Sequence, residues 1–526
     1  MITSVRTLLG LVCAAPAVAA QARPLTAAER STYAATSTNA EVGAFLDSLQ
    51  LAGAPIAVSE LGTTALGKPI YFVIASDPAV TSPGEAAAAG KLVIYLQGNI
   101  HGGEVEGKEA LLTVLRELAD TRRDLLQKLV ILAAADYNPD GNDAFGPQTA
   151  NRSEQNGPAL VGRRPDGENL DLNRDYFKAE APETRASLAR VYDTWDPALM
   201  VDLHTTDGTR HGYLLTYAPP LDPNGPPGPA RFVRDQMLPA IRKTLQDKYR
   251  EPIFDYGNVD NPLEPKSWDT YAPLGWYGTN YVGLRGRMAI LSEAYSHADF
   301  KTRVQVTHDF LVEILNYAAL HAEEIRRLER EADRQTTLEG AGLAPRPDLA
   351  VAYKLGSRGV EAVVLVLPTG ELRAYRLPVN DRFVDSLTRP LPAGYYLPPA
   401  AGEIAALLRL HGIQVQRLTV EWTDTVETLV AQISWAPREF QGHHQVQVGG
   451  TWVPTPRTVP AGTYFVSTAQ PLGRLVFALL EPEGNGLARW GAWDRYLGTE
   501  FGGGGAVEFP VSRARRAPHG SARSLP

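Results

Sequence analysis

The fold class of this chain is indicated most clearly by residues 94–112, which read IYLQGNIHGGEVEGKEALL. The first residues are β-branched, aromatic and aliphatic, which is typical of a buried strand. From Leu111 onward apolar side chains return at helical spacing, so a helix is predicted soon after the strand ends. The corner between the two elements is rich in glycine and holds His101 and Glu104, three residues apart. A buried strand that leads directly into a helix indicates an α/β protein.

Other segments repeat this pattern of an apolar run followed by polar residues. They are residues 68–77, 128–141, 197–208 and 287–297. Because strand-like runs alternate with helical ones, we expect a mixed, largely parallel sheet flanked by helices. Ligands of such sheets lie beyond the carboxyl ends of the strands. Four runs end in polar residues, at His101 and Glu104, at 138–140, at His204 and at Glu293, so these side chains are expected at one edge of the sheet.

The length of 526 residues is too great for one ordinary hydrophobic core, so more than one domain is expected. A long helix over 303–334 precedes a change in composition. Beyond it, proline and glycine separate apolar runs, which predict a β-rich region with one helix at 401–411; the runs are 360–368, 372–379, 425–435 and 472–482. The expected order is a signal peptide, an α/β domain, a linker, a β-rich accessory domain and a flexible tail, at residues 1–20, 21–335, 336–350, 351–510 and 511–526.

The N-terminus has the pattern of a secretory signal peptide. Arg6 supplies a positive start, residues 8–20 form an apolar stretch too short to span a membrane, and small residues at 17–20 offer a cleavage site. We therefore expect a secreted or periplasmic protein, with an uncleaved anchor helix as the alternative. Cys13 is the only cysteine. The exported chain would then have no thiol, and a metal would have to be held by histidine, aspartate or glutamate.

Composition and charge are those of an ordinary globular protein. Hydrophobic residues make up 44%, charged residues 21%, and the formal net charge is −8. A chain that binds nucleic acid usually carries a basic domain or stripe, so no nucleic-acid partner is expected. Beyond the N-terminal stretch, no segment of the sequence is long and apolar enough to predict a membrane span. The sequence leaves the oligomeric state unknown.

His101 and Glu104 could bind one cation together, because a histidine and a carboxylate three residues apart on a turn can converge. We expect the glycines between them to let this corner turn tightly. A catalytic zinc ion usually has three protein ligands and an open position for water. His204, which also ends an apolar run, is the best candidate for the third ligand. Taken singly, His101 could equally cap a surface turn, and His204 could be a hydrogen-bonded histidine at a strand end.

Five short motifs carry more information in their order than any one of them does alone. They are HGGE at 101–104, NPDG at 138–141, NLDLNRDYFK at 169–178, VDLH at 201–204 and LSEAYSH at 291–297. With this order and spacing, residues from about 36 to 320 resemble the zinc carboxypeptidase family, the carboxypeptidase A-like metallopeptidases. The resemblance implies that the α/β domain at 21–335 is catalytic, has the sheet of that family and acts on peptides with a free C-terminus.

The resemblance also implies how the metal and the base are supplied. One zinc ion would be bound by His101, Glu104 and His204, and Glu293 would match the catalytic glutamate at the end of a late strand. Zinc lowers the pKa of a bound water to about 7, so a carboxylate can take its proton at neutral pH. A glutamate in this position can return that proton to the leaving amine.

Further residues are implied to bind the substrate or support the metal. Asn173 and Arg174 would hold the terminal carboxylate of the peptide, for which the planar donor fork of an arginine is suited. Asp171 would orient His101 and raise its basicity. Two roles have several candidates. Arg152 has the nearest spacing for the arginine that stabilises the oxyanion, with Arg163 and Arg164 as competitors; the tyrosine that closes over the substrate could be Tyr271, Tyr277 or Tyr281.

The leading hypothesis is an exported zinc metallocarboxypeptidase that hydrolyses C-terminal peptide bonds. An amidohydrolase of the aspartoacylase or desuccinylase kind would share the zinc corner and the Asn-Arg pair, but the signal peptide argues against intracellular acyl-amino-acid metabolism. A hydrolase of cell-wall peptides would also be exported. A binding module derived from an inactive peptidase would be expected to lack a ligand or the glutamate, and the sequence has all four. The preferred C-terminal side chain, propeptide processing and the role of the accessory domain stay open.

Overall fold

The computed structural model describes residues 23–206, 208–497, 506–518 and 522–525, so the predicted signal peptide lies outside the described residues. Its central element is an eight-stranded sheet in the order β1-β2-β4-β3-β7-β11-β8-β9. These strands are β1 (Ile56–Thr63), β2 (Pro69–Ala75), β3 (Leu92–Gly98), β4 (Leu129–Ala134), β7 (Leu199–Thr205), β8 (Leu215–Ala218), β9 (Ile253–Asp255) and β11 (Met288–Ala294). The predicted mixed α/β sheet is confirmed.

The middle of this sheet is parallel, and its register brings polar residues together. Strand β3 pairs in parallel with β4 and with β7, and β7 pairs in parallel with β11. Glu293 of β11 lies directly opposite His204 of β7, and Gln97 of β3 lies opposite Asp202 of β7. The carboxyl ends of β3, β7 and β11 therefore meet at one edge, where ligands of parallel sheets bind.

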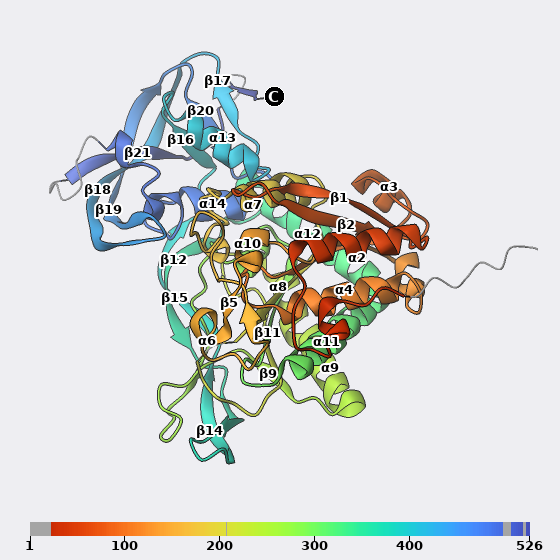
Figure 1. The fold of residues 1–526 in the computed structure, drawn as a ribbon. Coiled ribbons are helices and arrows are strands. Elements are labelled where there is room, and N and C mark those ends of the chain that lie inside the picture. The colour runs from red at the N-terminus through yellow and green to blue at the C-terminus, as the bar shows by residue number, and fades with distance from the viewer. Residues whose placement is uncertain (1–22, 207, 498–505, 519–521, 526) are drawn as a thin grey trace, which may run out of the picture.

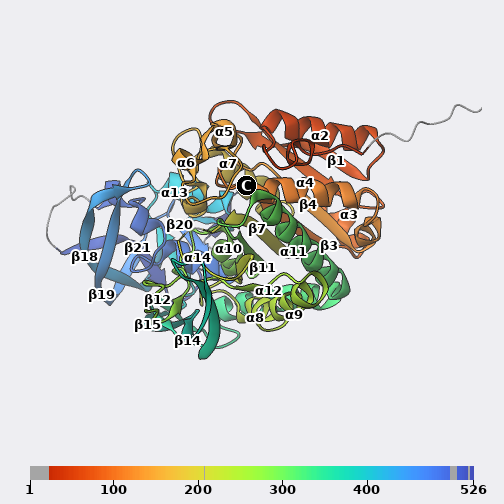
Figure 2. The same cartoon turned by 60° about the horizontal axis from the view of Figure 1, so that its bottom comes forward.

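Alternate residues of each strand face two different cores. In β3, Ile94 and Leu96 join a core that includes helices α4 (Glu106–Leu118) and α11 (Phe300–Leu320), while Tyr95 joins the core on the opposite face. Helices α4 and α11 pack against each other and against β3, β7 and β11, and Figure 2 shows them on one side of the sheet. This two-sided burial explains why the strand read as a continuous apolar run.

The second face of the sheet is covered partly by the C-terminal region. Its core contains side chains of α10 (Gly278–Leu284) together with those of α13 (Gly402–Leu410) and α14 (Gly473–Leu480). In Figure 1 the blue C-terminal strands lie at the upper left, and α14 and α10 lie between them and the red N-terminal strands. One hydrophobic core thus continues across the predicted domain boundary.

The C-terminal region is rich in strands, as predicted. It has a seven-stranded sheet, β19-β18-β21-β16-β20-β17-β22, a pair, β12-β15, and a small sheet in which β14 and β13 extend the short β10 (Trp268–Asp269). The strands are β12 (Asp348–Gly356), β13 (Val360–Val366), β14 (Leu372–Asn380), β15 (Arg382–Pro390), β16 (Gly394–Leu397), β17 (Gln416–Leu418), β18 (Trp422–Phe440), β19 (His443–Val459), β20 (Tyr464–Ser467), β21 (Ala506–Ala514) and β22 (Ala522–Ser524).

The remaining elements are short apart from two helices. They are α1 (Ala27–Arg30), α2 (Asn39–Leu51), α3 (Pro83–Ala88), α5 (Pro139–Asp143), α6 (Gln148–Asn151), α7 (Pro182–Ser187), α8 (Pro227–Phe232), α9 (Leu238–Thr244), α12 (Ala322–Ala341), β5 (Gly146–Pro147) and β6 (Leu160–Val161). Within the described ranges, no helix combines the length and the apolar character that crossing a bilayer would require.

Three expectations about secondary structure need correction. The apolar run 472–482, expected among the strands, forms α14, because a short run buried on all sides has no periodicity that separates a helix from a strand. The single long helix expected over 303–334 is two helices, α11 and α12, with His321 at their junction. Residues 511–514, placed in the expected flexible tail, continue β21.

A buried carboxyl near the start of α7 predicts a pH-dependent stability. Glu183 is fully buried, and neither carboxylate oxygen accepts a hydrogen bond from another described residue. Burial, with Asp166 and Asp140 nearby, raises its pKa from 4.5 to about 8. Because the pKa of Glu183 is higher in the folded than in the unfolded chain, the protonated carboxyl stabilises the fold fully below pH 4.5. This stability is lost as the pH rises through about 8, by about 1.4 kcal/mol per pH unit between the two values.

The variant Glu183→Gln keeps the shape of this side chain but does not titrate. Its free energy of unfolding, measured by chemical denaturation between about pH 5 and about pH 9, is therefore expected to fall less than that of the wild type as the pH rises. The exposed Glu168→Gln is the matched control and is expected to follow the wild type. Parallel curves for wild type and Glu183→Gln would show that Glu183 is not held neutral.

Candidate metal centre and surrounding pocket

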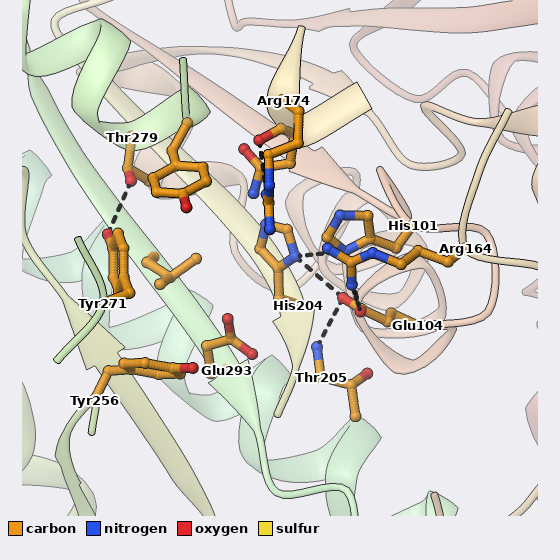
Figure 3. Close-up of a pocket in the computed structure, with 13 residues that line it drawn as sticks. His101, Glu104, Arg164, Arg174, His204, Thr205, Tyr256, Tyr271, Thr279 and Glu293 are labelled. Carbon is orange, nitrogen blue, oxygen red and sulfur yellow. Dashed lines mark hydrogen bonds and ion pairs between the residues drawn. The ribbon is translucent and has the colours of Figure 1, made fainter. Parts of the chain in front are cut away.

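Three predicted ligands converge at the carboxyl edge of the sheet. His101 and Glu104 follow β3, and His204 lies near the end of β7; each is at most 4% exposed. The two Nδ1 atoms of His101 and His204 are 3.2 Å apart. The Glu104 carboxylate places Oε1 3.0 Å from His101 Nδ1 and Oε2 3.1 Å from His204 Nδ1. Figure 3 shows the three side chains pointing toward one another.

The outer nitrogen of each histidine faces a carboxylate. His101 Nε2 lies 3.1 Å from Asp171 Oδ1, and His204 Nε2 lies 3.0 Å from Asp202 Oδ2, although the second approach is bent away from good hydrogen-bond alignment. In the tautomer that carries the proton on Nε2, both Nδ1 lone pairs point at the Glu104 carboxylate. Three buried lone-pair donors that face one another repel unless a cation lies between them. This donor set, two histidines and one glutamate with outer carboxylates, fits zinc.

The two glycines of the corner are required by close backbone packing. A Cβ on Gly102 would lie 2.2 Å from the carbonyl carbon of Gly141, and one on Gly103 would lie 2.7 Å from the oxygen of Gly162. Neither glycine has the positive φ that a tight left-handed turn would need. The glycines at 102 and 103 are therefore needed because the backbone of Gly141 and that of Gly162 leave no room for a side chain, and not because the chain makes a tight turn.

Two arginines contact the carboxylate ligand, and only one of the two belongs to the pocket lining. Arg152 Nη1 lies 3.0 Å from Glu104 Oε1, and its other amino group donates to the carbonyl oxygens of Thr205 and Thr206. Arg164 Nη1 lies 3.3 Å from the same Glu104 oxygen, and Arg164 lines the pocket. Burial would raise the pKa of Glu104, but His101 and Arg152 outweigh it and hold the pKa well below its usual range.

Glu293 faces the metal ligands across a pocket of about 130 Å³. It is half-buried near the end of β11, directly opposite His204 in the ladder. In Figure 3 its carboxylate points into the space between the ligands and the tyrosines. The other lining residues are Arg164, Asn173, Arg174, Thr205, Tyr256, Tyr271, Tyr277, Thr279 and Leu291. A substrate in this space would contact the ligands and Glu293 at once.

Asn173 and Arg174 reach the same pocket from the short helix η2 (Leu172–Arg174). The Arg174 guanidinium lies 4.5 Å over the ring of Tyr277 and donates to the backbone oxygen of Asn173. The side-chain oxygen of Asn173 accepts a hydrogen bond from Gly278 N–H at the start of α10. The NH₂ group of the Asn173 amide therefore points away from Gly278. Both side chains are therefore held as donors, which suits an anionic group.

The three tyrosine candidates for closing over the substrate differ in whether they line the pocket. Tyr271 and Tyr277 line the pocket, whereas Tyr281 is fully buried and its hydroxyl contacts His411. Sequence reasoning missed Tyr256, Thr205, Thr279 and Leu291. Two of them had a signal: Thr205 directly follows His204, and Leu291 precedes Glu293 by two residues and so shares its face of the strand. Tyr256 and Thr279 come from loops and a helix start that carried no such signal.

The sequence pattern of the family described as "Zinc carboxypeptidase" matches residues 43–208. Among curated proteins, "Carboxypeptidase 2" of Trichophyton rubrum is 24% identical over 450 residues, covering 79% of this chain and 76% of that protein. "Carboxypeptidase 2" of Trichophyton tonsurans has the same identity and the same coverage.

Solved structures with some likeness include the carboxypeptidase A from Helicoverpa armigera. It is 16% identical, with a TM-score of 0.39, and the likeness covers 55% of this chain and 74% of that one. A metallo-carboxypeptidase from Pseudomonas aeruginosa, in complex with (2-guanidinoethylmercapto)succinic acid, is 18% identical with a TM-score of 0.37, covering 54% and 69% of the two chains.

Proposed function

Because this chain belongs to the zinc carboxypeptidase family, we propose that it removes the C-terminal residue of peptides outside the cytoplasm. One observation carries the proposal: Arg174 lines the same pocket as the three metal-binding side chains and Glu293. An arginine that lines the same pocket as a hydrolytic centre would anchor the terminal carboxylate and so place the last peptide bond beside the centre.

The residues have distinct tasks in this proposal. His101, Glu104 and His204 would hold one zinc ion, which when bound supplies Lewis acidity and lowers the pKa of a water in the site. Glu293 takes a proton from the attacking water and delivers it to the leaving amine. Asn173 and Arg174 hold the substrate carboxylate.

The stabilisation of the oxyanion is assigned to Arg164, in preference to Arg152. Both guanidinium groups contact Glu104, but Arg164 lines the pocket and Arg152 does not. A donor can stabilise developing charge only where it reaches the reacting oxygen. Arg152 then keeps Glu104 ionised and fixed. Export is proposed from the N-terminal sequence pattern.

Exopeptidase recognition is tested by a peptide and its C-terminally amidated twin. The wild type is expected to cleave the free acid and to leave the amide almost untouched. In Arg174→Met, kcat/KM for the free acid is expected to fall about 10²-fold, because two hydrogen bonds to a charged group are lost. The amide rate is expected to stay low, so the preference collapses.

Arg163→Met is the matched control. Arg163 is exposed and directed at Asn169, so this variant is expected to keep the wild-type preference. Equal cleavage of the two peptides by the wild type would refute recognition of a terminal carboxylate and would favour an amidase or endopeptidase.

A further inference from the structure

The hairpin formed by β18 and β19 ends in a two-residue turn, Gln441–Gly442, with Phe440 paired to His443. Both turn residues have positive φ, +53° for Gln441 and +75° for Gly442. Such turns favour asparagine, aspartate or glycine at the first position, and glutamine there is conformationally costly. A strained residue that persists at the tip of a hairpin suggests a use for its side chain.

That side chain contacts the loop that supports the metal centre. The backbone N–H of Asp171 donates a 2.7 Å hydrogen bond to Gln441 Oε1, across 270 residues of sequence. Asp171 in turn links three parts of the site. Its Oδ1 lies 3.1 Å from His101 Nε2 and accepts from Asn173 N–H at 3.0 Å, and its Oδ2 accepts from Arg164 Nε at 3.0 Å.

A second contact fixes the hairpin to the same loop. His443 Nε2 lies 2.7 Å from Glu180 Oε1, and Glu180 Oε2 accepts from Lys178 Nζ at 2.8 Å. Behind the turn, Phe440 stacks on Trp490 with ring centroids 6.0 Å apart. The tip of the hairpin is thus held at both ends of residues 171–180, the segment that also carries Asn173 and Arg174.

We propose that Gln441 is a positioning residue of the peptidase and that the β18–β19 hairpin is a working part of its active site. By holding the backbone of Asp171, Gln441 keeps one carboxylate aligned on His101 and Arg164 together. Loss of a carboxylate that contacts a metal-binding histidine typically lowers metal affinity or activity about 10–100-fold, and loss of Gln441 would act through misalignment of that carboxylate, Asp171. The inference rests on the proposed function for its kinetic consequence, and on geometry alone for its effect on metal binding.

The test compares Gln441→Asn with Gln441→Glu in the full chain. Asparagine suits the turn better but is one methylene too short to reach Asp171, so folding is not endangered. For Gln441→Asn we expect zinc affinity, measured by competition with a chromogenic chelator, to fall about 10-fold or more and kcat to fall with it, while Tm stays equal or rises. Gln441→Glu keeps an acceptor oxygen and is expected to restore affinity and kcat.

Arg438→Ala, on the same hairpin and exposed, is the control and is expected to match the wild type in all three measurements. Wild-type zinc affinity and kcat in Gln441→Asn would overturn the inference, and so would an unrescued loss in Gln441→Glu. Failure of the proposed function is distinguishable: a wild type that cleaves amide and acid equally can still show the Gln441-dependent change in zinc affinity.

Discussion

Replacing Glu293 by glutamine is expected to lower kcat/KM about 10²–10⁴-fold, the usual contribution of a positioned general base. The amide has nearly the same shape as the carboxylate but cannot take a proton at neutral pH. Because Glu293 is not a metal ligand, zinc content is expected to stay at the wild-type value. The measurement is steady-state hydrolysis of a chromogenic peptide, with metal analysis on the same preparation.

The matched control is an exposed glutamate that does not line the pocket, Glu168. Glu168 is exposed on the loop that leads to Asp171, so the variant Glu168→Gln is expected to retain wild-type turnover. If Glu293→Gln hydrolysed the peptide at the wild-type rate with its zinc in place, the proton transfer would have to be reassigned to another group.

Replacement of His204 by alanine is the second change with a large expected effect. It removes one of three ligands and leaves Glu104 and His101 facing a gap, so the bound zinc is expected to fall well below one ion per chain. Activity is expected to drop by at least about 10³-fold, since the metal contributes several kcal/mol to the transition state. Metal analysis after gel filtration and peptide hydrolysis measure the two effects.

His297→Ala provides the matched histidine control. His297 lies four residues beyond Glu293, contacts the Tyr295 ring edge-to-face and is half-buried, so its removal is expected to leave zinc content unchanged. Full zinc binding by His204→Ala would mean that the metal is held by another set of side chains.

Wild-type protein stripped by a chelator is expected to lose activity and to regain it when zinc is added.

The residues that sequence reasoning brought together share one physical property: each lies at, or just beyond, the carboxyl end of a buried strand. His101, His204 and Glu293 end apolar runs, and the carboxyl ends of neighbouring parallel strands meet in space. Their convergence was therefore predictable without any tertiary contact. The alternation of strand-like runs with helical runs along the sequence likewise indicated a mixed sheet flanked by helices.

What could not be predicted depends on contacts between distant segments. Nothing near Gln441 in the sequence points to Asp171, because the bond that joins them bridges 270 residues. The run that forms α14 has the composition of a buried segment, and only its packing against α10 and α12 makes it a helix. The choice between Arg152 and Arg164 similarly depended on which of the two side chains lines the pocket in the folded chain.

The direct pairing of Glu293 with His204 in the β7–β11 ladder means that the pocket is built partly from adjacent strands and partly from loops. In the proposed function, His204 and Glu293 act from neighbouring strands, whose spacing is set by backbone hydrogen bonds. Three tyrosines that line the pocket, Tyr256, Tyr271 and Tyr277, come from irregular connections instead. A substitution in one of these connections is therefore expected to change the shape of the pocket without moving His204 relative to Glu293.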